Sequence, residues 1–307
     1  MLISICIPTY SRLNYLEEAV ASVFAQTVNN FEICVALDPT PNGPNKEIHD
    51  WCTQYAATNP VFRYKLNERN YGLSGNWNVL ASMAKGDYAI IIGDDDSLNP
   101  TFLEEVTNDI KKYWPDVVFS DQYFIDADGI ILKELTDEMS TKYHRSQLAP
   151  GLLTDPVENV LKNSVPMSSS VIRTSLLLKY PFDSSLNTPE LEVFLKIAAS
   201  NGIFSYVNKR VANYRVHATS ATSAGLRLHY MLRNIIPVEV ASKYEKLKYE
   251  LISQRIIPAI NICIREGNMA LGKYLIDSKY YPSDKAHLKI IQRILLHCPT
   301  FIGKKVV

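Results

Sequence analysis

The chain has 307 residues, with 32 Lys and Arg balancing 32 Asp and Glu, so its formal charge is zero. This balance excludes a generic nucleic-acid-binding protein, which needs a basic surface, and the 47% hydrophobic share excludes a disordered chain. A chain of this length is expected to form one large domain, or one domain with an appended module.

Alternating strand and helix patterns fill the first 120 residues. Apolar runs rich in β-branched residues predict strands, and apolar residues at helical spacing predict helices between them. The expected strands are residues 2–8, 31–37, 62–67, 88–92 and 116–120. The expected helices are residues 14–24, 46–57, 75–84 and 100–112. This alternation predicts an α/β fold whose mainly parallel, Rossmann-like sheet is covered by helices on both faces.

The rest of the chain has a weaker pattern. A hairpin is expected near residues 124–132, a helix at 189–201 and strands at 203–207 and 212–216, while residues 133–165 give no clear prediction. From about residue 226 the pattern is helical almost to the end. No apolar run approaches the roughly 20 residues that a membrane-spanning helix needs. The N-terminal residues lack the basic region of a signal peptide, and the five scattered cysteines fit a reducing cytoplasm.

Asp94, Asp95 and Asp96 directly follow the fourth expected strand. Two ionised carboxylates about 4 Å apart repel by roughly 4 kcal/mol at an effective dielectric constant near 20. Three in a row at a strand end therefore favour a bound cation, and oxygen ligands suit Mg²⁺ or Mn²⁺. The alternative is that they cap the helix that begins near residue 100. We favour the metal site.

Four other residues have both an ordinary and a functional interpretation. Asp38 follows the second strand and begins a proline-rich loop, where it is either a turn former or an acceptor for the N–H edge of a nucleobase. Because carboxyl ends of parallel strands meet at one edge, we expect it close to the Asp94–Asp96 run. Glu190 and Glu192 begin a helix, where they either complement its dipole or supply a general base. A lone histidine such as His217 is usually a surface residue or one with its hydrogen bonds satisfied. Taken alone, each of these four residues favours the ordinary interpretation.

These motifs in this order resemble family 2 glycosyltransferases, inverting enzymes with the GT-A fold, over residues 2–220. Residues 4–12, Ser-Ile-Cys-Ile-Pro-Thr-Tyr-Ser-Arg, resemble the family's opening strand and turn. Residues 70–78 resemble its Asn-x-Gly segment near the diphosphate, and Lys85-Gly86-Asp87-Tyr88 resembles the entry to its DxD strand. Residues 214–217 match a Tyr-Arg-x-His segment. Three positions depart from the pattern: Leu37 stands where a second acid is common, Gly93 stands where an acid is often found and so shifts the possible aspartate register by one, and Pro189-Glu190 replaces Glu-Asp.

The resemblance implies a role for each motif. Asp96 would be the direct ligand of Mn²⁺ or Mg²⁺, with Asp94 and His217 completing the site. Glu190 would be the general base, and Glu192 is its rival. The residues implied in binding the nucleotide-sugar are Pro8, Thr9, Tyr10, Arg12, Asp38, Asn70, Gly72, Asn78, Asp94 and Asp95.

The implied reaction is inverting transfer of a hexose or deoxyhexose from a nucleotide-sugar donor to a hydroxyl group. An aspartate that accepts from a base favours UDP- or dTDP-sugars. The acceptor would be a glycan, or a glycan on a polyprenyl diphosphate, in the synthesis of O-antigen, capsule or another bacterial surface polysaccharide. Two alternatives remain: a non-catalytic nucleotide-sugar-binding module, and a nucleotidyltransferase, although residues 8–13 lack the glycine-rich loop of the latter.

The expected domains are a GT-A catalytic domain at residues 1–222 and a helical extension at 223–307. Residues 1–120 would bind the donor and residues 121–222 the acceptor. Residues 225–307 hold 14 Lys and Arg against six Asp and Glu. Near the end, Leu288, Ile291, Ile294 and Leu295 share one helical side, and Lys289, Gln292 and Arg293 the other. A basic amphipathic helix either lies on an anionic membrane, here the inner face of the plasma membrane, or packs on the domain.

Overall fold

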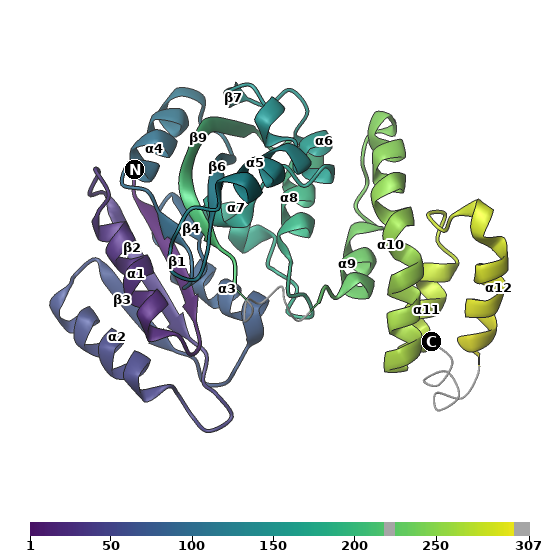
Figure 1. The fold of residues 1–307 in the computed structure, drawn as a ribbon, viewed down its shortest axis with the longest axis horizontal. Coiled ribbons are helices and arrows are strands. Elements are labelled where there is room, and N and C mark those ends of the chain that lie inside the picture. Colours follow the sequence, from purple (N-terminus) through teal and green to yellow (C-terminus); the bar gives the residue numbers. More distant parts are fainter. Residues whose placement is uncertain (218–224, 298–307) are drawn as a thin grey trace. The chain divides into compact units, whose positions relative to one another are not determined.

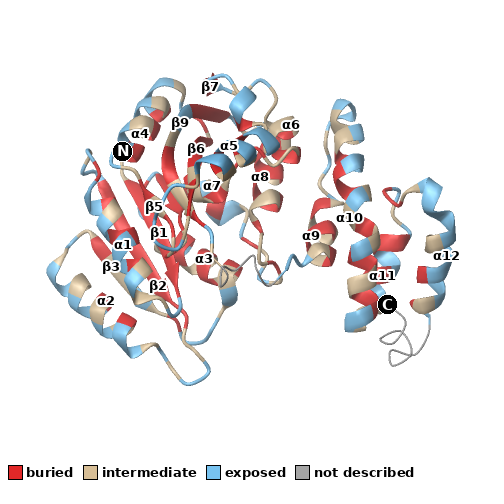
Figure 2. Cartoon of the chain, viewed as in Figure 1, coloured by how far each residue is buried: buried red, intermediate tan, exposed pale blue. Residues whose placement is uncertain are grey.

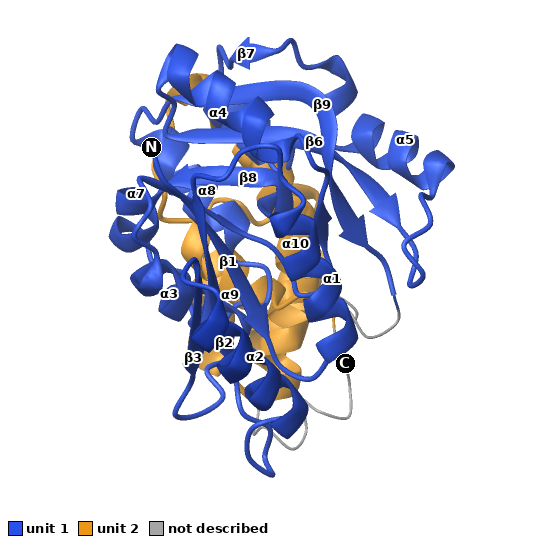
Figure 3. Cartoon of the chain, turned by 90° about the vertical axis from the view of Figure 1, so that its left-hand side faces the viewer, with its two compact units in different colours: residues 1–224 blue, residues 225–307 orange. Residues whose placement is uncertain are grey.

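The computed structural model describes residues 1–217 and 225–297 (Figure 1). Contacts within the chain divide it into two compact units, Met1–Ala224 and Gly225–Val307, which Figure 3 colours separately. We call them the N-terminal unit and the C-terminal unit. Each contains its own set of buried apolar side chains, as expected of a compact folding unit.

The N-terminal unit is built on a nine-stranded sheet in the order β3-β2-β1-β4-β8-β6-β9-β5, with β7 paired to β9. The strands are β1 Ile3–Thr9, β2 Phe31–Leu37, β3 Phe62–Leu66, β4 Tyr88–Ile91, β5 Ser97–Leu98, β6 Val117–Ile125, β7 Gly151–Leu152, β8 Ser170–Arg173 and β9 Phe204–Arg215. Strands β3, β2, β1 and β4 are mutually parallel, and so are β6 and β9. Strands β5, β7 and β8 pair antiparallel with their neighbours. The predicted α/β class is confirmed.

Helices cover both faces of this sheet. They are α1 Leu13–Phe24, α2 Lys46–Thr58, α3 Gly72–Met83, α4 Phe102–Tyr113, α5 Lys133–Lys142, α6 Pro156–Leu161, α7 Thr174–Lys179 and α8 Glu190–Ala199. Strand residues alternate between faces, so Ile5 packs in one apolar cluster with α1, α2 and α4, while the Cys6 thiol donates to the Leu80 carbonyl of α3 at 3.7 Å. Strands β1 and β2 are buried at every residue (Figure 2), as parallel strands between helices should be.

The second half of the N-terminal unit differs from the sequence prediction in its strands. The two short strands expected at 203–207 and 212–216 are one strand, β9, which pairs along β6 with register shifts near Asp121. Strand β6 therefore extends to Ile125, well beyond the expected end at residue 120. The expected hairpin is reduced to a turn in which the Asp126 carboxylate accepts the N–H groups of Asp128 and Ile130. Residues 133–165, without a prediction, contain α5, α6, β7 and the short helix Arg145–Gln147.

The C-terminal unit is helical, as predicted from residue 226 onward. Its helices are α9 Leu228–Ile235, α10 Glu245–Glu266, α11 Met269–Ile276 and α12 Ala286–Leu295. Pro258 lies inside α10, and Gly267 ends that helix with a left-handed φ of 77°. None of the described helices is both long enough and apolar enough to cross a bilayer.

Helix α12 does not bury the apolar side that the sequence suggested. Gln292 is buried, because its amide donates to the Ile257 carbonyl and to Asn261 Oδ1 and accepts from the Tyr281 hydroxyl. Ile291 and its neighbours Ile290 and Ile294 are more than half exposed instead. Hydrogen bonds of one buried amide therefore determine which side of this helix faces inward.

Candidate active site

The first functional side chains meet where β1, β2 and β4 end. Because these strands are adjacent and parallel, the residues that follow them share one edge of the sheet. The Asp38 N–H donates to the Thr9 carbonyl at 3.1 Å, and the Thr9 hydroxyl donates to Asp94 Oδ2 at 2.8 Å. Thr9 thus links the end of β2 to the end of β4, as the predicted proximity of Asp38 and the aspartate run requires.

The Arg12 guanidinium lies within the aspartate run. Its Nη2 donates to Asp94 Oδ1 at 2.5 Å, and its Nη1 lies 2.8 Å from Asp95 Oδ2. The same Nη1 lies 3.0 Å from His217 Nε2, which is itself 2.8 Å from Asp95 Oδ2. Nε2 can serve only one of these contacts, since it either accepts from Arg12 or donates to Asp95. We call Arg12, Asp94, Asp95, Asp96 and His217 the acid cluster.

Burial dominates the electrostatics of the two inner carboxylates. Burial raises the pKa of Asp94 to about 6, with Arg12 opposing the shift and Asp95 adding to it. Burial also raises the pKa of Asp96 well above its usual range, and the charge of Asp95 adds to this effect. Carboxylates in this condition are stabilised by a cation or a proton.

Arg215 braces the acid cluster from β9. Its backbone N–H donates to Asp96 Oδ1 at 3.0 Å, and its Nε donates to the Asp95 carbonyl at 2.7 Å. Its Nη2 pairs with Glu18 of α1 at 2.6 Å, and the Tyr15 ring lies 4.6 Å from its guanidinium carbon. With a side chain only 3% exposed, Arg215 is a fixed part of the wall. The sequence reasoning missed this role, although Arg215 stands in the Tyr-Arg-Val-His segment.

The carboxylate groups of the acid cluster are chemically suited to bind a divalent cation. Among the described residues, no Lys or Arg side chain pairs with Asp96. A Cβ on Gly93 would collide with Asp95 Oδ1 and lie 3.3 Å from Asp96 Oδ2, so only glycine leaves these oxygens their position. Carboxylate oxygens are preferred ligands of Mg²⁺ and Mn²⁺. Within residues 1–217 and 225–297, however, no three His, Cys, Asp or Glu side chains are arranged as a metal site, and Arg12 occupies oxygens of Asp94 and Asp95.

Asp38 lies in a second polar network, with a residue that the sequence reasoning missed. Asn67, which directly follows β3, donates its amide group to Asp38 Oδ1 at 2.8 Å and to Asn76 Oδ1 at 3.1 Å. Asn76 in turn donates to the Ala36 carbonyl at 2.9 Å, and this fixes the orientation of both amides. Asn67 Oδ1 is therefore an acceptor, and no described residue donates to it. Asn67 could have been predicted from the sequence, because it directly follows a strand expected to lie parallel to its neighbours, as Asp38 does.

A pocket of about 750 Å³ lies beside this network. It is lined by Tyr10, Pro39, Thr40, Pro41, Gly43, Pro44, Leu66, Asn67, Glu68, Arg69 and Asn70. Burial raises the pKa of Asp38, although its hydrogen bonds with Asn67 and with the N–H groups of Tyr71 and Gly72 oppose the shift. Prolines and a tyrosine with a few polar groups are typical of a pocket for a flat ring.

The segment at residues 70–78 contains the start of α3, and its two ends have different contacts. Asn70 Oδ1 accepts the N–H of Gly72 at 2.8 Å, which shapes the turn beside the pocket, and Gly72 has a left-handed φ of 70°. Asn78 points elsewhere, because its amide makes two hydrogen bonds with the backbone of Phe182, at 2.7 and 2.8 Å. Asn78 therefore fastens α3 to the segment that precedes α8.

Glu190 and Glu192 both lie in the first turn of α8 but have different surroundings. Glu192 is buried and forms an ion pair with Lys196 one turn later. Glu190 is half-buried, and burial raises its pKa to about 7, opposed by its own backbone N–H. A carboxylate with a pKa near 7 has the property of a general base at neutral pH.

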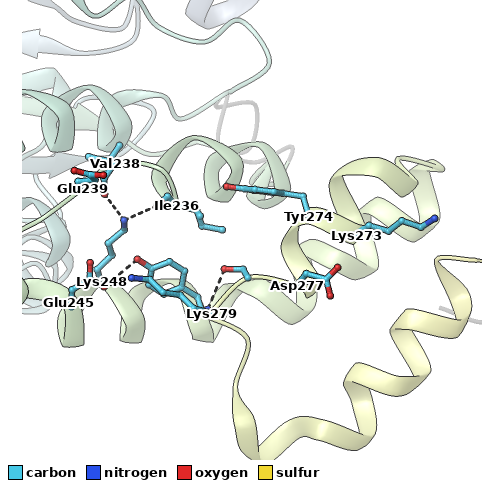
Figure 4. Close-up of a pocket in the computed structure, with 11 residues that line it drawn as sticks. Ile236, Val238, Glu239, Glu245, Lys248, Lys273, Tyr274, Asp277 and Lys279 are labelled. Atoms are coloured by element: carbon cyan, nitrogen blue, oxygen red, sulfur yellow. Dashed lines mark hydrogen bonds and ion pairs between the residues drawn. The ribbon is translucent and has the colours of Figure 1, made fainter.

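The C-terminal unit has a pocket of its own, of about 540 Å³ (Figure 4). Lys248 forms part of its wall and is buried, and its Nζ donates to the carbonyls of Ile236 at 2.9 Å and Val238 at 2.5 Å. Burial lowers the pKa of this lysine. Lys279 and Glu245 pair across the pocket at 3.0 Å. The bonds of Lys248 hold the segment between α9 and α10, and the Lys279–Glu245 pair joins α10 to the segment that follows α11.

Comparison with known proteins gives a family match over half of the chain. The family described as glycosyl transferase family 2 matches residues 4–158. A Methanocaldococcus jannaschii protein called uncharacterized glycosyltransferase MJ1057 is 27% identical over 223 residues, 70% of this chain and 71% of that protein. The Salmonella typhimurium abequosyltransferase RfbV is 40% identical over 100 residues, 32% of this chain and 29% of that protein. S. aureus TarS 1–349 in complex with UDP has a similar fold, with a TM-score of 0.64 at 15% identity, covering 99% of this chain and 89% of that one.

Proposed function

This chain belongs to glycosyl transferase family 2, and from that premise we propose that it transfers a sugar from a nucleoside-diphosphate donor to a hydroxyl group of a glycan acceptor. The observation that carries the proposal is the meeting of Asp38, Thr9 and Asp94 at one edge of the sheet. In open α/β sheets, ligands bind at this edge, beyond the carboxyl ends of the strands. A pocket lined by prolines and a tyrosine, together with the acid cluster at the same edge of the sheet, suits the two ends of a nucleoside diphosphate.

The donor is a UDP- or dTDP-sugar in this proposal. Asp38 and the unpaired Asn67 Oδ1 are both acceptors, and the N3–H of uracil or thymine is a single donor flanked by acceptors. Tyr10, which lines the pocket, holds the ring side, while Thr9 positions the strand end and Pro8 lies buried in β1. The TarS complex with UDP supports a uridine nucleotide, and the abequosyltransferase relative supports a hexose or deoxyhexose as the sugar.

The metal, Mn²⁺ or Mg²⁺, would be held by Asp96, with Asp94 and His217 as further ligands. When bound, such a cation neutralises the negative charge that develops on the leaving diphosphate. Asp96 is the strongest candidate because it is buried and, in the described structure, has no cationic side chain as a partner. Arg215 orients this carboxylate through its backbone N–H.

Glu190 is the general base in this proposal, and Glu192 is not, because Glu192 is paired with Lys196. Glu190 removes the proton from the acceptor hydroxyl while that oxygen forms a bond to the anomeric carbon. The bond to the diphosphate oxygen breaks on the opposite face, so the anomeric configuration inverts. The transition state resembles an oxocarbenium ion, as in glycoside hydrolysis.

Calorimetric titration tests the donor site. UDP, dTDP, GDP and CDP are each titrated into the full chain, with and without Mn²⁺, and again into Asp96→Ala. We expect one uridine or thymidine nucleotide to bind with metal and to lose that metal dependence in the variant. Absence of binding by all four nucleotides with metal present would overturn the proposal.

The acceptor is a glycan or a polyprenyl-diphosphate-linked glycan at an anionic membrane surface, on the cytoplasmic side, in bacterial surface-polysaccharide synthesis. Three isoleucines of α12, residues 290, 291 and 294, are more than half exposed beside Lys289 and Arg293. An exposed apolar stripe with basic neighbours suits the headgroup region of anionic lipid. The relative named as an abequosyltransferase supports the class of pathway.

A further inference from the structure

Arg12 is placed where a metal ligated by the acid cluster would have to bind. Its guanidinium contacts Asp94 Oδ1 at 2.5 Å, Asp95 Oδ2 at 2.8 Å and His217 Nε2 at 3.0 Å. Two of these groups, Asp94 and His217, are among the proposed metal ligands. A ligand atom about 2.0–2.2 Å from a metal cannot also accept a hydrogen bond from a cationic group on the same side. The two cations therefore exclude one another.

We propose that Arg12 is an internal counter-cation that fills the acid cluster in the nucleotide-free protein and leaves it when the metal and the donor diphosphate bind. This inference rests on the proposed function, since it assumes a metal at Asp96 and a diphosphate beside it. It adds that the Arg12 guanidinium neutralises the carboxylates before the metal and the donor bind. Once displaced, Arg12 becomes available to the diphosphate.

The surroundings of the two arginines show which of them can leave. Arg215 is 3% exposed, donates to the carbonyls of Asp95 and Ala127, and pairs with Glu18, so its release would strand buried carbonyls. Arg12 has a side chain 29% exposed, and among the described residues its side chain contacts the acid cluster and the Tyr15 ring, 5.9 Å away. Arg12 also stands at the start of α1, so its long side chain can swing without disturbing the helix.

Exchange of the cations couples the two ligands. A guanidinium binds phosphate oxygens in the same forked geometry as carboxylates, so an incoming diphosphate competes for Arg12. If the protein without ligands keeps Arg12 in the cluster nine times in ten, metal affinity falls about tenfold by population alone. A diphosphate that draws Arg12 away restores that affinity, and by reciprocity the metal strengthens nucleotide binding by the same factor.

The test is Mn²⁺ affinity of the full chain, measured by electron paramagnetic resonance of free Mn²⁺, with and without UDP. Without UDP, we expect Arg12→Gln to bind Mn²⁺ about tenfold or more tightly than the unmodified protein. With UDP, the two affinities should differ much less, because Arg12 has already left the cluster. Arg12→Lys keeps the charge but cannot bridge three groups, and its affinity without UDP should lie between the two.

Arg173→Gln is the matched control, because it removes an arginine of similar exposure that pairs with Asp116, outside both the acid cluster and the nucleotide pocket. It should leave Mn²⁺ affinity without UDP unchanged, and a gain as large as that of Arg12→Gln would reduce the effect to general electrostatics and overturn the inference. Equal Mn²⁺ affinity of Arg12→Gln, Arg12→Lys and the unmodified protein would also overturn it, while the proposed metal site would stand. Failure of all these proteins to bind Mn²⁺, even with UDP, would instead refute the metal site, and the inference with it.

Discussion

The acid cluster and the start of α8 both contain buried carboxylates, but these carboxylates have different partners in the two regions. In the acid cluster, Arg12 and His217 contact Asp95, and Arg12 also contacts Asp94. At the start of α8, Glu192 has Lys196 as its partner, whereas the described residues give Glu190 no partner besides its own N–H. The difference suits the two proposed tasks. Cationic side chains hold Asp94 and Asp95 in place in the acid cluster, whereas Glu190 has no cationic partner among the described residues that would keep it ionised, so it can take up a proton near pH 7.

Replacing Glu190 should have the largest effect on turnover. Loss of a general base costs about 10²- to 10⁴-fold, so Glu190→Gln should reduce kcat by that factor. Its nucleotide affinity should be unchanged, because Asp38 and the acid cluster remain intact. Steady-state sugar transfer and calorimetry measure the two quantities.

Glu192→Gln is the matched control, since it makes the same chemical change two residues later, at a carboxylate that is buried and paired with Lys196. It should keep kcat within about tenfold, as expected of a group outside the reacting atoms. A larger loss in Glu192→Gln than in Glu190→Gln would exchange the two roles. Full turnover in Glu190→Gln would favour another base.

Replacing Asp96 should have the next largest effect, because the proposed metal would contribute several kcal/mol to stabilising the leaving group. We expect Asp96→Asn to lose roughly 10²-fold or more in activity, together with the Mn²⁺ dependence of nucleotide binding. Asp126→Asn, in an exposed turn outside the cluster, is the control. Mn²⁺-dependent binding that persists in Asp96→Asn would move the principal ligand to Asp94 or Asp95.

The pH dependence of the rate should show the titration of Glu190 first as pH falls, because its pKa is higher than the value of about 6 for Asp94. Its pKa is raised to about 7, and a base must be deprotonated, so kcat/KM should fall about tenfold per pH unit below pH 7. A carboxylate with an ordinary pKa would keep the rate level down to about pH 5. The profile is measured at saturating Mn²⁺, and a level rate between pH 7 and pH 5 would count against Glu190 as the base.

Stability should change in opposite directions at the two glutamates of α8. The folded-state pKa of Glu190 is raised from 4.5 to about 7, so folding is penalised increasingly as pH rises through this interval and the carboxylate ionises. Glu190→Gln should therefore be more stable than the unmodified protein at pH 8, by about 1–3 kcal/mol, and nearly equal at pH 4. Glu192→Gln loses an ion pair and should be less stable at pH 8 by about 0.5 kcal/mol. Denaturant unfolding at both pH values measures the differences, and a destabilised Glu190→Gln at pH 8 would contradict them.

Periodicity and strand ends predicted the parallel sheet and the neighbourhood of Asp38 and Asp94, because parallel strands place their ends together whatever the side chains are. The orientation of side chains was beyond such patterns. Asn78 belongs to a motif typical of a ligand site, yet it bonds the Phe182 backbone, 104 residues later in the chain. Arg12, predicted to bind the nucleotide, contacts Asp94 and Asp95 in the structure, and the sequence did not indicate these contacts. Both depend on long-range partners, which a local sequence pattern does not contain.

Replacing the exposed isoleucines of α12 should have the smallest effect on sugar transfer. It should selectively weaken binding to membranes. Changing Ile290, Ile291 and Ile294 together to Gln should leave nucleotide binding unchanged, because these residues lie in a different unit from the donor site. If each loses about 1 kcal/mol of apolar contact with lipid, binding to phosphatidylglycerol-containing vesicles should weaken roughly 10²-fold. Leu178→Gln with Ile203→Gln, exposed apolar residues of the N-terminal unit, is the control and should bind vesicles normally.

Two results would give this surface another partner. Equal vesicle binding by the triple variant, accompanied by a change from dimer to monomer in light scattering, would make the isoleucines an interface between copies of the chain. Binding to purely zwitterionic vesicles as tight as to anionic ones would remove the role of the basic residues, since their attraction of about 1 kcal/mol per Lys or Arg requires anionic lipid. The isoleucines of α12 and Glu190 thus have one thing in common. Each lacks the contacts that would satisfy it within the described structure, apolar burial for the isoleucines and a cationic partner for Glu190, and each is therefore proposed to meet a partner molecule.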